Sequence, residues 1–227
     1  MSPDGDFSYP MCPDIVLLKS IGQDARVYRY ARLLRPEMIE IGNSVIIDDL
    51  VTLDGGLGTT IGDFTHLAGH GLYAGGGKLT VGNFCGLSGG ICVYTGSDDF
   101  TGESLGNPTI PYPFRQPVRS FVRIGDHVQI GANSVVLPGV TIGEGAAVGA
   151  MSLVLRDCEP WTIYAGVPAR PLRNRPKERI LELEAGLRRV AYDDNGVYLP
   201  RERWRWKEES KKYPLWEEFV GMTGGGH

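Results

Sequence analysis

The chain has 227 residues, a net charge of −4 at pH 7 and a pI near 5.6, so it lacks the basic balance expected of a nucleic-acid-binding protein. Its four cysteines form neither a C-x-x-C pair nor a zinc-ligand spacing, and we expect no metal site and no disulfide framework. The first residues are polar and acidic, unlike a signal peptide, and no apolar run approaches the roughly 18 residues of a membrane span. These features predict a cytoplasmic protein without stable membrane insertion.

A strict repeat organises most of the chain. An aliphatic residue followed by glycine recurs every 20 residues, at Ile21, Ile41, Ile61 and Val81, and apolar residues divide each block into steps of six. The same step returns later, at Ile124, Ile130, Val136, Ile142, Val148 and Val154. Six residues suffice for one short strand and a corner, so three steps close a triangular coil and about six coils stack by parallel pairing. A β-sandwich is disfavoured, because its strands recur at roughly 8–12 residues with irregular turns.

Two stretches carry a resemblance to a known family. The segments "IGDHVQIGANSVVLPGVTIGEGAAVGAMSLV" and "IYAGVPARPLRNR" resemble the hexapeptide-repeat acyltransferases. This resemblance implies an all-β, left-handed parallel β-helix, a homotrimer, and acyl-CoA held in clefts between neighbouring subunits. The left-handed coil would be an exception to the right-handed crossover rule.

A narrower resemblance concerns the substrate. The stretches "GLYAGGG", "YTGSDDFTGESLGNPTIP" and "AMSLV…EPWTIYAGVPAR" together are similar to acyltransferases that modify amino-deoxy sugars on nucleotide carriers. Their type is the dTDP-4-amino-4,6-dideoxyglucose acyltransferase of bacterial O-antigen pathways. The resemblance implies acetyl-CoA-dependent N-acetyl transfer to the amino group of a nucleotide-linked sugar, with no metal required. The acyl group, the sugar and the nucleotide are left open.

The repeat also predicts the organisation of the chain. We expect residues 1–18 to cap the first coil, residues 19–175 to form the β-helix, and residues 176–227 to form a C-terminal helix and extension. The period breaks once, over residues 99–123, where four prolines and four aromatic residues argue for an ordered arm. By resemblance to related trimers, the arm would reach a neighbouring subunit and wall the active site. A variable surface insertion is the alternative.

The arm begins with two acidic residues that are candidates for catalysis. Many relatives carry a histidine here, in an N-H pair after a turn glycine; counting from Gly96, Asp98 and Asp99 occupy these places, and Asp99 replaces the histidine. An aspartate near pKa ~3.9 is a poor base at neutral pH unless burial or a like charge raises its pKa. The pair could therefore deprotonate the amine or bind the ammonium. Amines need less base catalysis than hydroxyls, so a site without histidine favours an amino-sugar acceptor.

Further candidates surround this pair. His70 is a third catalytic candidate, as a base or substrate contact, with a surface imidazole at a corner as the alternative. Sugar binding is assigned to Glu103, Asn107 and Tyr94.

The resemblance also suggests a binding region for CoA. Backbone amides of Gly131, Ala132, Gly149 and Ala150 would line the pantetheine arm. Arg170, with Arg173 or Arg175, would meet the phosphates through charge-assisted hydrogen bonds, and Trp161 would stack near adenine. The alternatives are a solvated charge at the end of the solenoid for Arg170 and an aromatic plug over the last coil for Trp161.

Two other functions stay open on the sequence alone. One is O-acetyl transfer to a sugar or a xenobiotic. The other is a β-helix without catalysis or one that binds metal, which needs three histidines converging between subunits. The available histidines are His66, His70 and His127, but they form no H-x-x-x-x-H array, and His127 is expected at an outward position.

Overall fold

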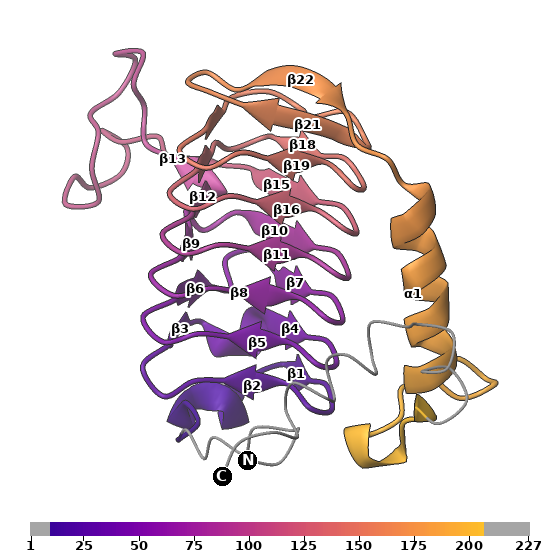
Figure 1. The fold of residues 1–227 in the computed structure, drawn as a ribbon. Helices are drawn as coiled ribbons and strands as arrows, with labels where there is room; N and C mark the ends of the chain where they lie inside the picture. Colours follow the sequence, from indigo (N-terminus) through magenta and orange to yellow (C-terminus); the bar gives the residue numbers. More distant parts are fainter. Residues whose placement is uncertain (1–9, 207–227) are drawn as a thin grey trace, which may run out of the picture. The chain divides into compact units, whose positions relative to one another are not determined.

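The computed structural model describes residues 10–206. Pro10–Arg175 form one compact unit, and the described residues from Pro176 onward belong to a second. The larger unit is a parallel β-helix whose three sheets run along the stack of coils (Figure 1). The predicted all-β solenoid is therefore confirmed.

Each coil contributes one short strand to each sheet. The first sheet has the order β1 (Ser20–Ile21), β4 (Ile39–Ile41), β7 (Thr59–Ile61), β10 (Lys78–Val81), β15 (Phe121–Ile124), β18 (Thr141–Ile142). The second has the order β2 (Arg26–Val27), β5 (Ile46–Ile47), β8 (His66–Leu67), β11 (Gly86–Leu87), β16 (Gln129–Ile130), β19 (Ala147–Val148), β21 (Thr162–Ala165), β22 (Arg170–Asn174). The third contains β3 (Arg32–Leu34), β6 (Thr52–Asp54), β9 (Leu72–Ala74), β12 (Cys92–Tyr94), β17 (Val135–Val136), β20 (Leu153–Val154). Only the β21–β22 pair in these sheets is antiparallel.

The register of the coils follows the repeat of the sequence. Ile41 pairs with Ile61, Ile61 with Val81, and Val81 with Ile124. These four side chains are at most 3 % exposed, so each lies on its equivalent in an aliphatic column inside the prism. The long interval between Val81 and Ile124 is thus a single step of the stack, and the residues between them include an extruded arm.

One corner of the prism carries a ladder of polar side chains. Side-chain oxygens of Asn43, Asp63, Asn83 and Asp126 each accept the backbone N–H of the corresponding residue one coil earlier, at 2.7–2.9 Å. The backbone N–H groups of this corner therefore have acceptors within the solenoid. In an exposed turn, these N–H groups would instead donate to water. This corner is closed to a ligand that needs backbone donors.

Aromatic rings stack beside the same corner. Phe64 lies 5.2 Å from Phe84, and Phe84 lies 5.1 Å from His127, measured between ring centroids. Trp161 continues the column at 5.9 Å from His127, because Gly145 leaves room where a Cβ would lie 2.3 Å from the indole. His127 is only 5 % exposed, because Phe84 and Trp161 lie against its ring, so an outward position in the repeat does not make this imidazole accessible. Its neighbours in the column cover both faces of its ring.

The described part of the second unit is mainly helical. The predicted helix is confirmed as α1 (Glu178–Ala191), and its last turn carries Arg188 and Arg189, which suit the negative end of the helix dipole. Single 3-10 turns complete the described elements: η1 (Pro13–Leu17), η2 (Pro36–Met38), η3 (Arg201–Arg203). Within residues 10–206, no helix combines the length and apolarity required to span a membrane. The predicted extension beyond residue 206 lies outside the described residues.

Tyr73 is an exception in the aliphatic column of the third sheet. It is 1 % exposed, and its hydroxyl lacks a hydrogen-bond partner among residues 10–206. Burial raises the pKa of this phenol well above its ordinary value. Gly71 makes room for the ring, because a Cβ there would lie 2.7 Å from Cε2 of Tyr73. A buried donor without an acceptor reduces the stability of the fold.

We expect Tyr73→Phe to raise the free energy of unfolding by about 1 kcal/mol, because it removes the unpaired hydroxyl and keeps the ring. Urea denaturation at one fixed protein concentration measures this change. Tyr112→Phe is the control, since Tyr112 is 70 % exposed, and it should leave the midpoint unchanged. A loss of stability in Tyr73→Phe would contradict the interpretation.

Candidate active site

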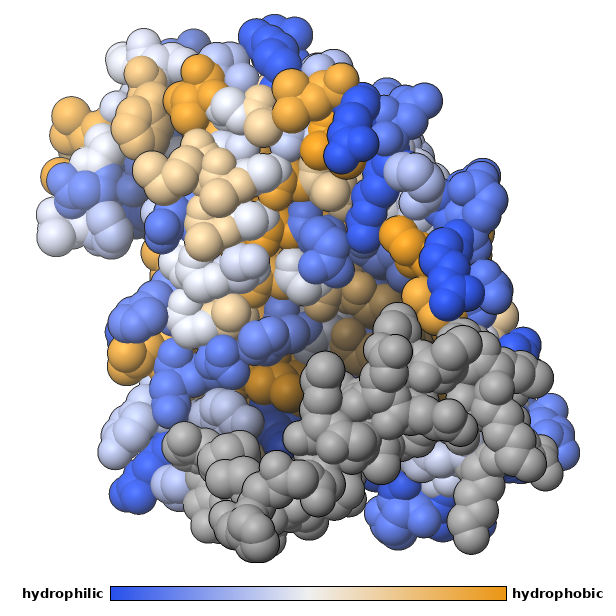
Figure 2. All heavy atoms as spheres, viewed as in Figure 1, coloured by the Kyte–Doolittle hydropathy of each residue, from blue (hydrophilic) through white to orange (hydrophobic). Residues whose placement is uncertain are grey.

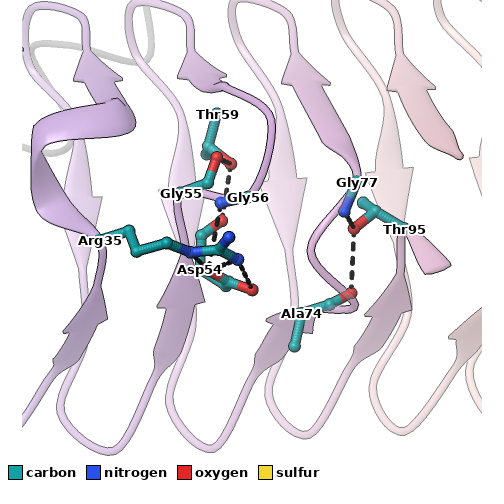
Figure 3. A network of polar contacts seen from close by, with 8 residues as sticks. All are labelled: Arg35, Asp54, Gly55, Gly56, Thr59, Ala74, Gly77 and Thr95. Carbon is teal, nitrogen blue, oxygen red and sulfur yellow. Dashed lines mark hydrogen bonds and ion pairs between the residues drawn. The ribbon is translucent and has the colours of Figure 1, made fainter. Parts of the chain in front are cut away.

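The arm leaves the solenoid directly after Thr95, which is 3 % exposed. The Thr95 hydroxyl accepts the Gly77 N–H at 2.9 Å and lies 3.2 Å from the Ala74 carbonyl, to which it donates (Figure 3). Its carbonyl accepts the Ser120 N–H at 2.8 Å, so one residue holds both ends of the arm. The antiparallel pair β13 (Gly96–Ser97) and β14 (Val118–Arg119) forms the base.

The arm lies three residues earlier in the chain than predicted. The sequence suggested a loop over residues 99–123, but β15 begins at Phe121 and pairs with β10. Phe121 and its two successors therefore belong to the prism. Apolar and hydrophilic residues share the surface of the arm, which extends from the β-helix near β13 (Figures 1 and 2). Its most exposed aromatic side chains are Phe100, Tyr112 and Phe114, at 92 %, 70 % and 63 %.

Asp99 holds the first turn of the arm. Its Oδ1 accepts both the hydroxyl and the backbone N–H of Thr101 at 2.6 Å, and its Oδ2 accepts the Ser104 N–H at 2.6 Å. The Thr101 hydroxyl and these backbone donors lower the pKa of Asp99 well below its ordinary value. A carboxylate so strongly stabilised in its charged form is a weak base. This geometry favours a role for Asp99 in shaping the arm.

Asp98 has a different environment. Its Oδ1 accepts a hydrogen bond from Arg115 Nε at 2.7 Å, and the Arg115 side chain is only 11 % exposed. The second carboxylate oxygen, Oδ2, accepts no hydrogen bond from residues 10–206. Of the two predicted acids, Asp98 is thus the one that keeps an oxygen for a ligand. Sequence reasoning did not identify Arg115.

The arm also contains two of the three predicted sugar-binding residues. Asn107 has a φ of 103°, and its Oδ1 accepts the N–H and the hydroxyl of Thr109 at 2.9 and 2.6 Å, so it forms a turn. Glu103 is exposed on the arm. Tyr94 ends β12, just before the arm, and burial followed by the nearby Cys92 raises the pKa of its phenol. The binding roles of these residues stay predictions.

The histidines lie outside the arm. His70 is exposed at a corner with a φ of 62°, and no hydrogen bond joins it to another residue within 10–206. His66 Nε2 lies 3.0 Å from Asp48 Oδ2 on the face of the second sheet. Across the described residues, no group of three or more His, Cys, Asp or Glu side chains is arranged to hold a metal ion.

A second corner of the prism offers backbone donors. The N–H groups of Ala132 and Ala150 donate to no acceptor within residues 10–206, and those of Gly69 and Gly89 continue the same row on earlier coils. The Gly149 N–H is used, because it donates to the Tyr164 carbonyl at 2.8 Å. The Gly131 N–H is used as well, because it donates to the Val148 carbonyl at 2.7 Å. Two of the four predicted amides are therefore available and two are not.

The last coil contains a cavity of about 180 Å³ beside the predicted phosphate-binding arginines. Its lining includes Arg170, Arg156 and the buried Cys158, whose pKa is raised to about 11 by burial. Arg170 and Arg173 are exposed on β22. Part of the Arg175 guanidinium is occupied, since its Nη1 donates to the His127 and Gly145 carbonyls at 2.8 and 2.9 Å.

Trp161 has the environment of a cap. Its ring lies over Gly145 and beside His127, as the alternative interpretation expected. The indole is partly exposed, so a contact with adenine stays a prediction.

Comparison with known proteins identifies the family. The profile described as Bacterial transferase hexapeptide (six repeats) matches residues 121–156. The dTDP-4-amino-4,6-dideoxy-D-glucose acyltransferase of Escherichia coli is 36 % identical over 178 residues, which span 78 % of this chain and 92 % of that protein. A chloramphenicol acetyltransferase of Agrobacterium fabrum is 29 % identical over 150 residues, 60 % of this chain and 63 % of that protein.

A solved structure shows the same relationship. AntD, an N-acyltransferase from Bacillus cereus in complex with dTDP and 3-hydroxybutyryl-CoA, is 38 % identical, with a TM-score of 0.71 over 75 % of this chain and 89 % of that chain. A variant of AntD was solved with dTDP-4-amino-4,6-dideoxyglucose and coenzyme A. The fold is that of a hexapeptide-repeat protein. The chain belongs to the acyltransferases of this family, with the dTDP-4-amino-4,6-dideoxyglucose enzymes among its relatives.

The environment of Asp99 gives a prediction for the arm. We expect Asp99→Ala to accelerate amide hydrogen exchange in a peptide covering Thr101 and Ser104 at pH 7, because both amides lose their acceptor. Because the folded pKa of Asp99 lies below the ordinary 3.8, this support is fully present above pH 3.8 and is lost as the pH falls through the lower folded pKa. Exchange measured by mass spectrometry, corrected for intrinsic rates, tests both statements.

Glu103→Ala is the matched control, since Glu103 is exposed on the same turn. It should leave the exchange of the peptide unchanged. Equal exchange in Asp99→Ala and the wild type at pH 7 would show that the carboxylate does not hold the arm.

Proposed function

We propose that this protein transfers an acyl group from acyl-CoA to the amino group of a nucleotide-linked 4-amino-4,6-dideoxy sugar. The observation that carries the proposal concerns Asp98. Arg115 holds its Oδ1, and its Oδ2 accepts no hydrogen bond from the described residues. An amino group needs an acceptor and a negative charge, and a carboxylate supplies both. The relatives that bind or act on such sugars are similar over most of this chain.

The second corner and the last coil fit the donor substrate. The free amides of Ala132 and Ala150 match the amide carbonyls of a pantetheine arm, which accept hydrogen bonds. Arg170 and Arg173 bring positive charge where the phosphates would lie, and Arg–phosphate hydrogen bonds are strong. When bound, acyl-CoA supplies an activated thioester carbonyl. Acetyl is the expected acyl group.

Catalysis by this site depends mainly on orientation. The Asp98 carboxylate would accept a hydrogen bond from the neutral attacking amine and direct its lone pair toward the carbonyl carbon. As the C–N bond forms, the C–S bond breaks, and the proton lost by the amine is taken up by the departing CoA thiolate. Backbone N–H groups aimed at the developing negative charge typically contribute about 10²- to 10³-fold in rate. The Asp99 carboxylate is occupied by hydrogen bonds within the arm, and a mechanism based on orientation requires neither Asp99 nor His70 as a base. This division favours an amine over a hydroxyl acceptor.

We also propose that the enzyme acts as a cytoplasmic homotrimer in O-antigen synthesis. The arm supports an assembly, because Phe100, Tyr112 and Phe114 are each more than 60 % exposed on one chain. Such side chains are stabilised when a neighbouring subunit covers them. In a trimer, the arm of one subunit would complete the site of the next.

The reaction is tested by release of free CoA thiol. We expect turnover with dTDP-4-amino-4,6-dideoxyglucose, using acetyl-CoA and 3-hydroxybutyryl-CoA as donors, and none with dTDP-6-deoxyglucose, which offers only hydroxyls. Asp98→Asn should lower kcat/KM by about 10²-fold, because the attacking amine is then no longer held in place. Asp99→Asn should lose much less, because its amide oxygen still accepts a hydrogen bond from the arm.

The 3-amino isomer of the sugar is the specificity control. Turnover of the hydroxyl sugar alone would replace the proposal with O-acyl transfer. If neither acyl-CoA donor releases thiol with either amino sugar, the proposed function is wrong.

A further prediction concerns donor binding. We expect Arg170→Met to raise KM for acetyl-CoA about tenfold with little change in kcat, because a charge-assisted hydrogen bond to a phosphate contributes to binding throughout the reaction. The difference from the wild type should shrink at high salt. Steady-state kinetics measure both effects.

Arg32→Met is the control for this change, since Arg32 is an exposed arginine on the first coil. Equal effects of the two substitutions on KM would exclude a specific role for Arg170.

A further inference from the structure

We propose that Arg115 is a positioning residue that acts through Asp98. This inference rests on the proposed function and concerns how the acidic group of that site is aimed. Arg115 Nε donates to Asp98 Oδ1 at 2.7 Å, which fixes one oxygen and leaves the other open. A carboxylate held at one oxygen cannot rotate freely about its last bond. Its second oxygen therefore points in one direction.

Hydrogen bonds hold Arg115 itself on both sides. Its preceding neighbour Phe114 accepts the Leu105 N–H through its carbonyl at 3.0 Å, and the N–H of its following neighbour Gln116 donates to Ser104 Oγ at 3.3 Å. Ser104 in turn donates its N–H to Asp99 Oδ2. The outgoing and returning limbs of the arm are thus linked, and the link places the guanidinium against Asp98.

Asp98 and Asp99 are therefore parts of one chain of hydrogen bonds. Asp99 holds Ser104, Ser104 holds the returning limb, and the returning limb presents Arg115 to Asp98. Arg115 is 9 % exposed as a whole residue, so its position is determined by packing as well as by the ion pair. A lysine at this place would keep the charge but not the planar donor that meets a carboxylate side-on.

A matched ion pair elsewhere in the chain provides a control. Arg35 Nη2 contacts both oxygens of Asp54 at 2.6 and 2.7 Å, at a corner of the first coils (Figure 3). Here the arginine side chain is 48 % exposed, and both carboxylate oxygens are occupied. Arg35–Asp54 is a structural pair, whereas Arg115–Asp98 leaves one oxygen for a substrate.

The test is a double-mutant cycle on thiol release with the amino sugar. Arg115→Met should lower kcat/KM by about 100-fold, as a misplacement of about 1 Å does. In the Asp98→Asn background, Arg115→Met should lower kcat/KM by less than about threefold, because there is then no carboxylate for Arg115 to position. Arg115→Lys should recover part of the loss, and KM for acyl-CoA should not change. Arg35→Met should alter kcat/KM by less than about threefold.

The outcomes separate this inference from the proposed function. No turnover of any amino sugar by the wild type overturns both. Wild-type turnover with losses that multiply in the double variant overturns the inference alone, since Arg115 would then act on the substrate directly. A loss in Arg115→Met no larger than in Arg35→Met, or a thermal midpoint that falls in proportion to the activity loss, also overturns it.

Discussion

Parallel pairing between successive coils is the constraint on which the rest of the structure depends. Each inward side chain must lie on its equivalent one coil earlier, because a single coil cannot bury its own apolar face. Ile61, Val81 and Ile124 meet this condition at 2 % exposure or less. A residue inserted within a strand would move every later side chain out of its column. Insertions are therefore tolerated only at corners.

The arm follows from the same constraint. It leaves and returns at one corner, and Thr95 joins its two ends, so β10 and β15 pair as they would if the arm were absent. Because the arm lies outside the six-residue repeat, it can contain prolines, acidic residues and aromatic residues that would disrupt the strands of the prism. Chemistry that needs irregular geometry is thereby placed on a rigid support.

The fold could be predicted from sequence because its signal is local and repeated. The six-residue step determined the strands and their register, and α1 followed from its own apolar spacing. His127 shows a signal that was present but unused: it follows Ile124 by three places, as Phe64 follows Ile61 and Phe84 follows Val81. A side chain at this place in the step stacks on its equivalents, so the sequence already implied a ring column.

The candidate site was harder to predict from the sequence, because it depends on contacts that the six-residue repeat does not encode. Asp98 and Asp99 could be found beside the turn glycine, but their separate roles could not. Arg115 is distant in sequence and meets Asp98 only because the arm folds back. Likewise, which amides of a corner stay free depends on the neighbouring coil: Gly149 is used by Tyr164, whereas Ala150 is not.

The contrast between the two acids also bears on mechanism. Asp98 and Asp99 have different hydrogen-bond partners, so a pair of adjacent like charges need not share one site. Asp99 faces the N–H groups of its own turn, which favour its charged form, and Asp98 faces Arg115 and the space where a substrate would bind. A proton shared between two carboxylates requires both to face the same group, and this arrangement separates them. The acidic pair is therefore better suited to hold and aim an amine than to act as a coupled base.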